Sequence, residues 1–162
     1  MTMPRILIIT GEASGDLHGA HLVQALREKA PSLRIVGVGG RRMREAGAEL
    51  VKDIPQQDVM GLIGPSKVTQ LISRVRRIRR LLKRELWDLV VLIDNPGLNF
   101  HFARIAKAAG RRVLYYIAPQ VWAWRPGRMR WIQRRVDHVV SILPFEQELY
   151  RRAGVRCTFV GN

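Results

Sequence analysis

Acidic residues are scarce in this sequence. The 162-residue chain has 13 Asp and Glu residues against 28 Lys and Arg residues, which gives a formal net charge of +15 at pH 7. Such an excess of positive charge favours an anionic partner, which can be a nucleic acid, an anionic membrane surface or a phosphorylated substrate. The shortage of acidic residues therefore predicts a negatively charged partner but does not distinguish among these three classes.

Cysteine and long apolar runs are scarce as well. Cys157 is the single cysteine, so an intrachain disulfide is excluded and a reducing compartment is favoured. The longest apolar run, 89–93, has the length of a strand and falls far short of the roughly 20 residues of a membrane span. The apolar start at 6–9 is followed at once by Gly11 and Glu12, so no signal peptide is expected.

Short apolar runs alternate with helical patterns along the chain. Strands are expected at 6–9, 34–38, 89–93, 113–117, 139–143 and 158–160, and helices at 16–29, 41–46, 67–84, 101–109, 129–136 and 146–152. This alternation predicts parallel β-α-β units in one domain, and hence an α/β fold with a doubly wound parallel sheet. Ligands of such sheets bind at the carboxyl ends of the strands.

The first strand is followed by the turn "GEASGD", whose noteworthy residues are Gly11, Glu12, Ser14, Gly15 and Asp16. The glycines allow a tight turn and close approach of a ligand, while Ser14 or Asp16 can cap the next helix, which alone would explain both. The spacing is not G-x-G-x-x-G, and Glu12 stands where a pyrophosphate would sit, which argues against a dinucleotide site. Two carboxylates beside exposed amides suit a ligand with several hydroxyl or amide groups, such as a sugar.

Asp94 ends the buried strand "LVVLID" and is the best single candidate for chemistry. A carboxylate at this position can serve as a general base. Pro96 and Gly97 then force a turn, and Asn99 can cap the following helix. The alternative is that Asp94 merely begins that cap.

A loop with two tryptophans, "APQVWAWRPGR" at 118–128, follows the fourth predicted strand. Trp122 and Trp124 can stack on sugar rings or line an acyl-chain channel, and Arg125 and Arg128 can hold phosphate. The alternative is a tryptophan wedge that packs between helices.

The segment 67–84 has the pattern of a basic amphipathic helix. One face is apolar and the other is basic without an acid; the apolar residues are Val68, Leu71, Ile72, Val75, Ile78, Leu81 and Leu82, and the basic ones are Arg74, Arg76, Arg77, Arg79, Arg80, Lys83 and Arg84. The pattern is typical of a helix at an anionic membrane, and equally of a core-packed helix with a solvated basic face; the two are compatible. In the preceding segment 58–64, an apolar group can dip into acyl chains: Val59, Met60, Leu62 and Ile63.

Metal and thiol chemistry have little support. His18 and His21 are three residues apart on a predicted helix, but no third ligand completes a set, so neither a metal nor a cofactor is expected. Cys157 begins a strand without a nearby base, which favours a buried thiol over a reactive one.

Seven motifs together resemble, in order and spacing, the N-terminal half of the lipid-A-disaccharide synthase family. They are "GEASGD", "VGVGG", "VMGL", "IDNPGLNF", "YYIAPQVWAWRPGR", "LPFE" and "CTFVGN", and they cover nearly all of the chain. The resemblance implies an inverting glycosyltransferase of the two-lobed GT-B type. It would join UDP-2,3-diacylglucosamine to 2,3-diacylglucosamine 1-phosphate with release of UDP, in the lipid A biosynthesis of Gram-negative bacteria. It would work in the cytoplasm as a peripheral protein on the inner face of the membrane.

The resemblance also implies roles for the candidate residues. Asp94 would take the proton from the acceptor's 6-hydroxyl group. Substrate would be contacted by Gly11, Glu12, Ser14, Gly15, Asp16, Asn99, Gln120, Trp122, Trp124 and Arg125. Acyl chains and the anionic membrane would meet Val59, Met60, Leu62, Ile63, Arg76, Arg77, Arg79 and Arg80.

Two departures from the family pattern shape these expectations. Gly97 stands where the family often has a second acid, which leaves Asp94 as the single candidate base. The chain ends at "VGN", and the nucleotide site of GT-B enzymes is mainly in the second lobe, so 1–162 is expected to be one acceptor-side lobe, inactive alone.

Two alternative functions stay open: a GT-B lobe with another acceptor, such as an epimerase-like or peptidoglycan-precursor protein, and a basic α/β module for nucleic acid. No RNP, KH or helix-turn-helix pattern supports the second.

Overall fold

The computed structural model describes residues 3–52, 54, 65–117, 120 and 127–161. Its centre is a seven-stranded sheet in the order β3-β2-β1-β4-β5-β6-β7, in which every neighbouring pair is parallel. The strands are β1 (Arg5–Thr10), β2 (Arg34–Val38), β3 (Glu49–Leu50), β4 (Leu89–Ile93), β5 (Val113–Tyr116), β6 (His138–Ser141) and β7 (Cys157–Phe159). The predicted fold class, an α/β fold with a doubly wound parallel sheet, is confirmed.

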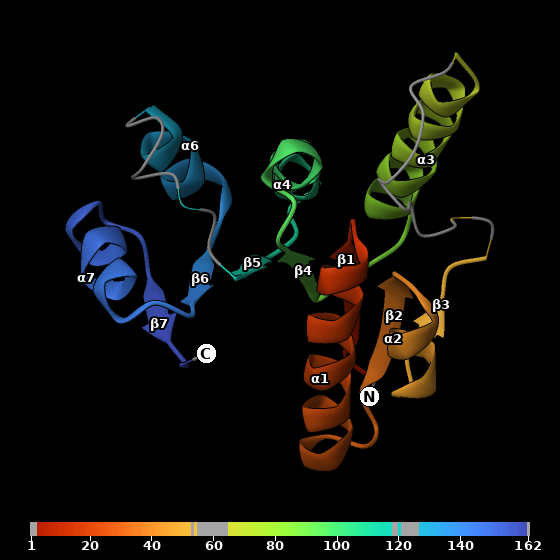
Figure 1. The fold of residues 1–162 in the computed structure, drawn as a ribbon, viewed down its shortest axis with the longest axis horizontal. Helices are drawn as coiled ribbons and strands as arrows, with labels where there is room; N and C mark the ends of the chain where they lie inside the picture. The colour runs from red at the N-terminus through yellow and green to blue at the C-terminus, as the bar shows by residue number, and fades with distance from the viewer. Residues whose placement is uncertain (1–2, 53, 55–64, 118–119, 121–126, 162) are drawn as a thin grey trace.

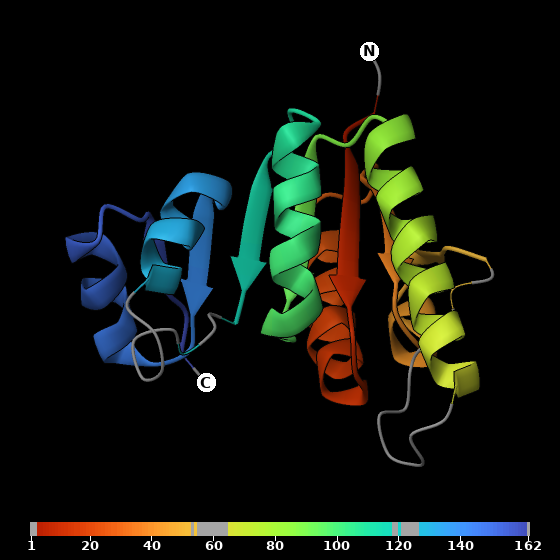
Figure 2. The ribbon, with the colours of Figure 1, turned by 90° about the horizontal axis from the view of Figure 1, so that it is seen from above.

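The helices form two layers, one on each face of the sheet (Figures 1 and 2). The first layer holds α1 (Ala13–Lys29) and α2 (Arg41–Glu45), and the second holds α3 (Pro65–Arg84), α4 (Pro96–Ala108), α6 (Gly127–Arg135) and α7 (Pro144–Arg152). Alternate strand residues serve the two layers. In β1, Ile8 belongs to the core cluster under α1 and α2, while Leu7 and Ile9 belong to the cluster under the other four helices.

The strand order changes direction between β1 and β4. From β1 the chain builds outward to β2 and β3, and α3 then carries it back to β4 on the other side of β1. The register aligns the ends of these strands, because Ile9 pairs with both Val38 and Leu92, and Ile93 pairs with both Thr10 and Tyr116. Such a switch point is where open parallel sheets bind ligands.

The predicted strands lie where the apolar runs placed them, with β2 and β4 at their predicted bounds. The sequence pattern missed β3, because two residues at the sheet edge leave no period to detect. The predicted starts of α4 and α7 were also late. Both helices begin at a proline, Pro96 and Pro144, because proline favours the first helical position, where its missing N–H costs nothing.

Helix α3 is rotated relative to its predicted apolar face. Ile78 and Leu82 are buried as expected, but Val68 and Ile72 are 55% and 44% exposed. Arg74, predicted on the basic outer face, is buried instead. The helix packs on the sheet mainly through its second half, and Val68 and Ile72 in its first half lie outside the core. None of the described helices combines the length and apolar composition needed to cross a bilayer.

Candidate functional site

The candidate site is built from the turns that follow β1, β2 and β4, together with Ile117 at the end of β5. The arrowheads of β1, β5 and β6 in Figure 2 point to one edge of the sheet, which is the carboxyl edge of the parallel strands. The turns of the predicted motifs "GEASGD", "VGG" and "DNPG" all lie at this edge, as expected.

Gly11 brings the first of these turns against the third. A β-carbon placed on Gly11 would lie 2.0 Å from the side-chain nitrogen of Asn95 and 3.0 Å from its β-carbon. No residue with a side chain fits there, so glycine allows the turn after β4 to rest directly on the turn after β1. The predicted sugar-binding turn and the predicted base are therefore neighbours in space.

The start of α1 differs from the capping prediction. The helix begins at Ala13, with Glu12 at the N-cap position in an extended conformation and without a side-chain capping bond. Ser14 lies inside the first turn rather than at the cap, and both Glu12 and Ser14 are exposed at the carboxyl edge. Their exposure leaves them open to contact with a ligand.

Asp16 does not cap its own helix either; it caps α2. Its carboxylate is buried and accepts hydrogen bonds from three backbone N–H groups: Gly40 (2.7 Å) and Met43 (3.3 Å) to Oδ1, and Arg42 (3.1 Å) to Oδ2. A negative charge is favourable at a helix N-terminus, where N–H groups lack intrahelical partners. Asp16 thus fixes the turn after β2 to α1.

The turn that carries Asp94 has an unusual backbone. Asp94 and Asn95 both have positive φ angles, 51° and 42°, and so does Ile117 at the end of β5, with 64°. Asp and Asn tolerate the left-handed region better than other residues, whereas a β-branched residue there is a rare outlier. Backbone strain of this kind gathers at functional sites, because surrounding structure must hold it in place.

Asn99 and Tyr115 hold this turn. The Asn99 side-chain nitrogen donates hydrogen bonds to the carbonyl oxygens of Ile93 (3.0 Å) and Asp94 (2.6 Å), and the Tyr115 hydroxyl donates to Asp94 O at 2.8 Å. Both side chains are buried. The prediction that Asn99 caps α4 is wrong: the residue lies inside the helix and reaches back to the strand end. Sequence reasoning missed Tyr115, which reads as an ordinary core residue of a strand.

Burial raises the pKa of the Tyr115 hydroxyl far above its ordinary value, and the nearby charge of Asp94 raises it further. The hydroxyl therefore stays protonated near neutral pH and acts as a hydrogen-bond donor. The backbone N–H of Asp94 also donates to Tyr116 O at 3.3 Å. Asp94 itself is half-buried at the carboxyl edge, and both its backbone N–H and its backbone carbonyl oxygen are hydrogen-bonded.

Arg74 reaches the same edge from α3. Its guanidinium donates a 3.0 Å hydrogen bond to the carbonyl oxygen of Thr10, the last residue of β1. Burial lowers the pKa of Arg74, but a guanidinium stays charged in proteins. The amphipathic pattern could not reveal this role, because it places every arginine of the segment on the outer face.

Several predicted residues lie outside the described residues. They are Trp122, Trp124 and Arg125 of the tryptophan loop, and Val59, Met60, Leu62 and Ile63 before α3. Gln120 is described and exposed, and Arg128 lies with its guanidinium 5.6 Å from the centre of the Phe100 ring. Arg76, Arg77, Arg79 and Arg80 are exposed on α3. Among the described residues, no group of three His, Cys, Asp or Glu side chains is arranged to hold a metal ion.

Comparison with known proteins identifies relatives over nearly the whole chain. A family model described as "LpxB: Lipid-A-disaccharide synthetase" matches residues 6–162. Proteins named lipid-A-disaccharide synthase are similar to the chain in Trichlorobacter lovleyi (46% identity over 159 residues, 98% of this chain and 42% of that protein) and in Coxiella burnetii (44% over 163 residues, 100% and 43%). The chain thus spans less than half the length of the curated relatives it matches.

Two solved structures show the same fold at low sequence identity. One is a putative UDP-N-acetylglucosamine 2-epimerase from Listeria monocytogenes (TM-score 0.65, 18% identity, 94% of this chain and 42% of that chain). The other is Alr3699/HepE from Anabaena in complex with UDP and glucose (TM-score 0.59, 13% identity, 98% and 44%). In both, the match covers less than half of the larger protein, as with the sequence relatives.

Proposed function

This chain belongs to the lipid-A-disaccharide synthase family, and from that premise we propose that it is the acceptor-side lobe of an inverting glycosyltransferase. The reaction joins UDP-2,3-diacylglucosamine to 2,3-diacylglucosamine 1-phosphate and releases UDP. The observation that carries the proposal is the position of Asp94, at the switch point of the sheet and in a turn held by Asn99 and Tyr115. No cofactor or metal takes part in the proposed reaction.

In this proposal Asp94 is the general base. Its carboxylate accepts the proton of the acceptor's 6-hydroxyl group while that oxygen attacks C1 of the donor sugar. The bond between C1 and the oxygen of the UDP β-phosphate breaks, its electron pair leaves with UDP, and the configuration at C1 inverts. Proton removal by a placed base contributes about 10²- to 10⁴-fold to the rate of such a step.

The other site residues orient the two sugars. Glu12 and Ser14, exposed beside Gly11 and Gly15, bind sugar hydroxyl or amide groups. Asp16 and Asn99 are buried and position these turns indirectly, because their polar side-chain atoms are hydrogen-bonded to the backbone of the neighbouring turns. Gln120, Trp122, Trp124 and Arg125 complete the substrate contacts. Contacts to UDP come mainly from a second lobe outside these 162 residues, so this lobe alone binds acceptor but does not turn over.

The proposal also places the protein on the cytoplasmic side of the inner membrane. Its substrates are acylated, so the enzyme must meet them at a lipid surface. The exposed Arg76, Arg77, Arg79 and Arg80 supply charge for an anionic bilayer, and Val59, Met60, Leu62 and Ile63 supply apolar contact with acyl chains.

Replacement of Asp94 by asparagine tests the proposed base. In a protein of the relatives' full length that carries this lobe, Asp94→Asn should lower kcat by about 10²- to 10⁴-fold, because the amide keeps the shape and loses the basicity. Asp88→Asn, just before the other end of β4, is the matched control: Asp88 accepts a hydrogen bond from the Arg5 N–H at 2.7 Å, which an amide oxygen can also accept. Formation of the disaccharide is followed by thin-layer chromatography. An Asp94→Asn protein within threefold of wild type removes Asp94 from the mechanism.

A further inference from the structure

The positive charge of this protein is concentrated in three helices of one layer. The sequences of α3, α4 and α6 contain eight, two and four Lys or Arg residues, and not one Asp or Glu. The other helices are mixed: α1 and α7 each hold two acidic and two basic residues, and α2 holds one and three. The net charge of +15 therefore arises largely from one side of the molecule.

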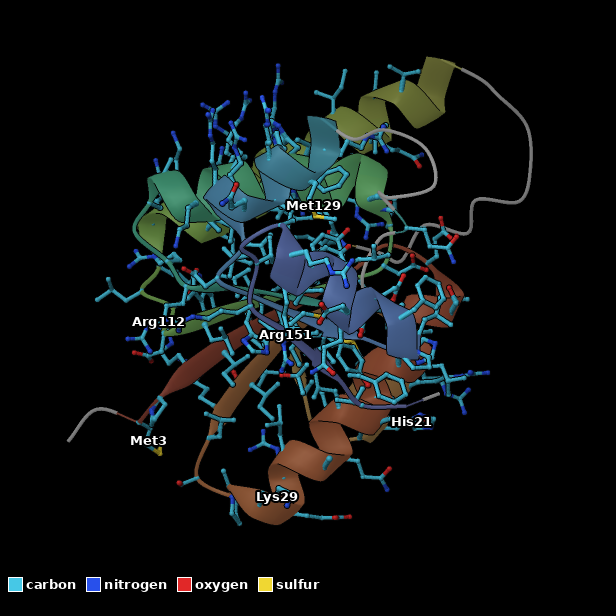
Figure 3. The ribbon with its side chains drawn as sticks, turned by 90° about the vertical axis from the view of Figure 1, so that its left-hand side faces the viewer. Met3, His21, Lys29, Arg112, Met129 and Arg151 are labelled. Carbon is cyan, nitrogen blue, oxygen red and sulfur yellow. The ribbon has the colours of Figure 1, made fainter. Side chains whose placement is uncertain are left out.

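The three helices lie side by side over the sheet. α3 contacts α4, and α4 contacts α6, and the three helices lie in one layer over the sheet in Figures 1 and 2. In Figure 3, where Met129 marks α6, nitrogen-tipped side chains project outward from this layer. The exposed bases are Arg76, Arg77, Arg79, Arg80, Lys83, Arg84, Arg104, Arg128, Arg130 and Arg134. We call the outer surface of α3, α4 and α6 the three-helix face.

The positive charges of this face lie close enough together to lower the pKa of a neighbouring histidine. Burial lowers the pKa of His101 on α4, and the charges of Arg104 on α4 and Arg79 on α3 lower it further. Because α3, α4 and α6 contribute no acid of their own, their like charges repel one another and oppose the compact state. Such a cost is relieved when an extended anionic partner lies against the whole face.

Apolar and aromatic groups accompany the cations. Val68 and Ile72 are exposed on α3, among the arginines of the same helix. On α6, the Arg135 guanidinium lies 4.6 Å from the centre of the Trp131 ring. A surface that combines arginines with exposed aliphatic groups and half-buried aromatic rings is typical of the interface between water and lipid. A nucleic acid would use the charge but not the aliphatic groups.

We propose that the whole three-helix face, and not α3 alone, lies on an anionic membrane surface. The choice of a membrane as the partner rests on the proposed function; the extent of the contact rests on the charge distribution. The footprint ends at α7, whose charges balance.

This contact sets the orientation of the lobe. Each of the three helices follows a strand and returns to the start of the next one, so the helix N-termini lie at the carboxyl edge of the sheet. With the three-helix face on the bilayer, the strands run along the membrane plane. Asp94 then sits at the side of the lobe, close above the headgroups, where the sugar of a lipid acceptor can reach it while its acyl chains stay in the membrane.

The test compares two pairs of arginines that carry the same charge and lie on opposite layers. Arg130→Gln/Arg134→Gln removes two exposed charges from α6, and Arg42→Gln/Arg44→Gln removes two exposed charges from α2. Binding of the chain is measured by sedimentation with vesicles of phosphatidylglycerol and phosphatidylcholine at low salt, where charge attraction is least screened. We expect about 10- to 30-fold weaker binding for the α6 pair and less than threefold for the α2 pair.

Three further measurements keep the outcomes distinct. Arg130→Lys/Arg134→Lys should bind vesicles as wild type does, which separates lost charge from lost folding. Arg76→Gln/Arg79→Gln on α3 should weaken binding about as much as the α6 pair. Retention on duplex DNA at the same salt identifies a nucleic-acid surface.

The proposal is overturned if the α6 pair behaves like the α2 pair, or if it lowers DNA binding but not vesicle binding. If the α3 pair weakens binding and the α6 pair does not, the membrane contact is confined to α3, and the proposed enzymatic function is unaffected. Failure of that function would appear instead in the disaccharide assay with detergent-dispersed substrates and a protein of the relatives' full length, where the α6 pair and the α2 pair should leave kcat unchanged.

Discussion

The side-chain nitrogen of Asn95 lies 2.0 Å from the position that a β-carbon on Gly11 would occupy. This contact joins the turns after β1 and β4, which the chain separates by more than 80 residues. The proposed sugar-binding turn and the proposed base can share one site only because the residue at position 11 lacks a side chain.

We expect Gly11→Ala to destabilise the protein. The new methyl group forces the turn that carries Asp94 away from β1, and overpacking of this kind costs about 1–3 kcal/mol of unfolding free energy. Urea unfolding followed by circular dichroism measures the change. Gly97→Ala is the control, because a β-carbon there meets only Asn95 Oδ1 at 3.8 Å, an ordinary contact. Asn95→Gly should restore part of the loss in the Gly11→Ala protein; equal stability of the two alanine variants would contradict the close packing.

The hydrogen bonds to the Asp94 carbonyl lead to a prediction about rate. Asn99→Ala removes the donor to Ile93 O and Asp94 O, which loosens the left-handed turn and lets the carboxylate drift. Misplacement of a catalytic group by about 1 Å can cost on the order of 10²-fold in rate. We expect kcat per folded molecule, in a protein of the relatives' full length, to fall roughly 10- to 100-fold, with KM changed much less.

Tyr115→Phe provides the graded comparison. It removes one of the two side-chain donors to Asp94 O and leaves Asn99 in place, so the loss in kcat should be smaller than for Asn99→Ala. A purely structural role would lower the melting temperature in both variants and leave kcat per folded molecule unchanged. That result would remove both residues from the positioning of the base.

Asp16→Asn should reveal the bond between α1 and α2. An asparagine offers one acceptor oxygen where the carboxylate accepts from three N–H groups, and its NH₂ group then faces a donor. Hydrogen bonds to a buried charge contribute about 1.5–3 kcal/mol each, so we expect a loss in that range from urea unfolding. Glu28→Gln, an exposed change on the same helix, should stay within about 0.5 kcal/mol of wild type. A loss no larger than that of Glu28→Gln would mean that Asp16 contributes little to this junction.

The sequence predicted the strands well because a parallel strand buried on both faces is a nearly continuous apolar run, as in 89–93. It could not predict the roles of Asp16 and Asn99, whose side chains have the composition of helix caps but bind backbone outside their own helix. Arg74 shows the same limit. Its place in a basic repeat predicts exposure, and only the packing of α3 on the sheet turns it toward Thr10.

The last prediction concerns acid stability at the opposite edge of the sheet. Burial alone would raise the pKa of the Asp137 carboxyl, but hydrogen bonds from Lys107 and from the Val113 N–H, with the charges of Lys107 and Arg112, lower it below its ordinary value. A carboxyl with a lowered pKa in the folded state stabilises the protein above the pKa of the unfolded chain, about 3.9, and loses that contribution as the pH falls through the folded value. The melting temperature of wild type should therefore exceed that of Asp137→Asn at pH 7, and the gap should narrow as the pH falls below about 3.9. A gap that is constant with pH would show that the charge of Asp137 does not stabilise the junction of α4, β5 and β6.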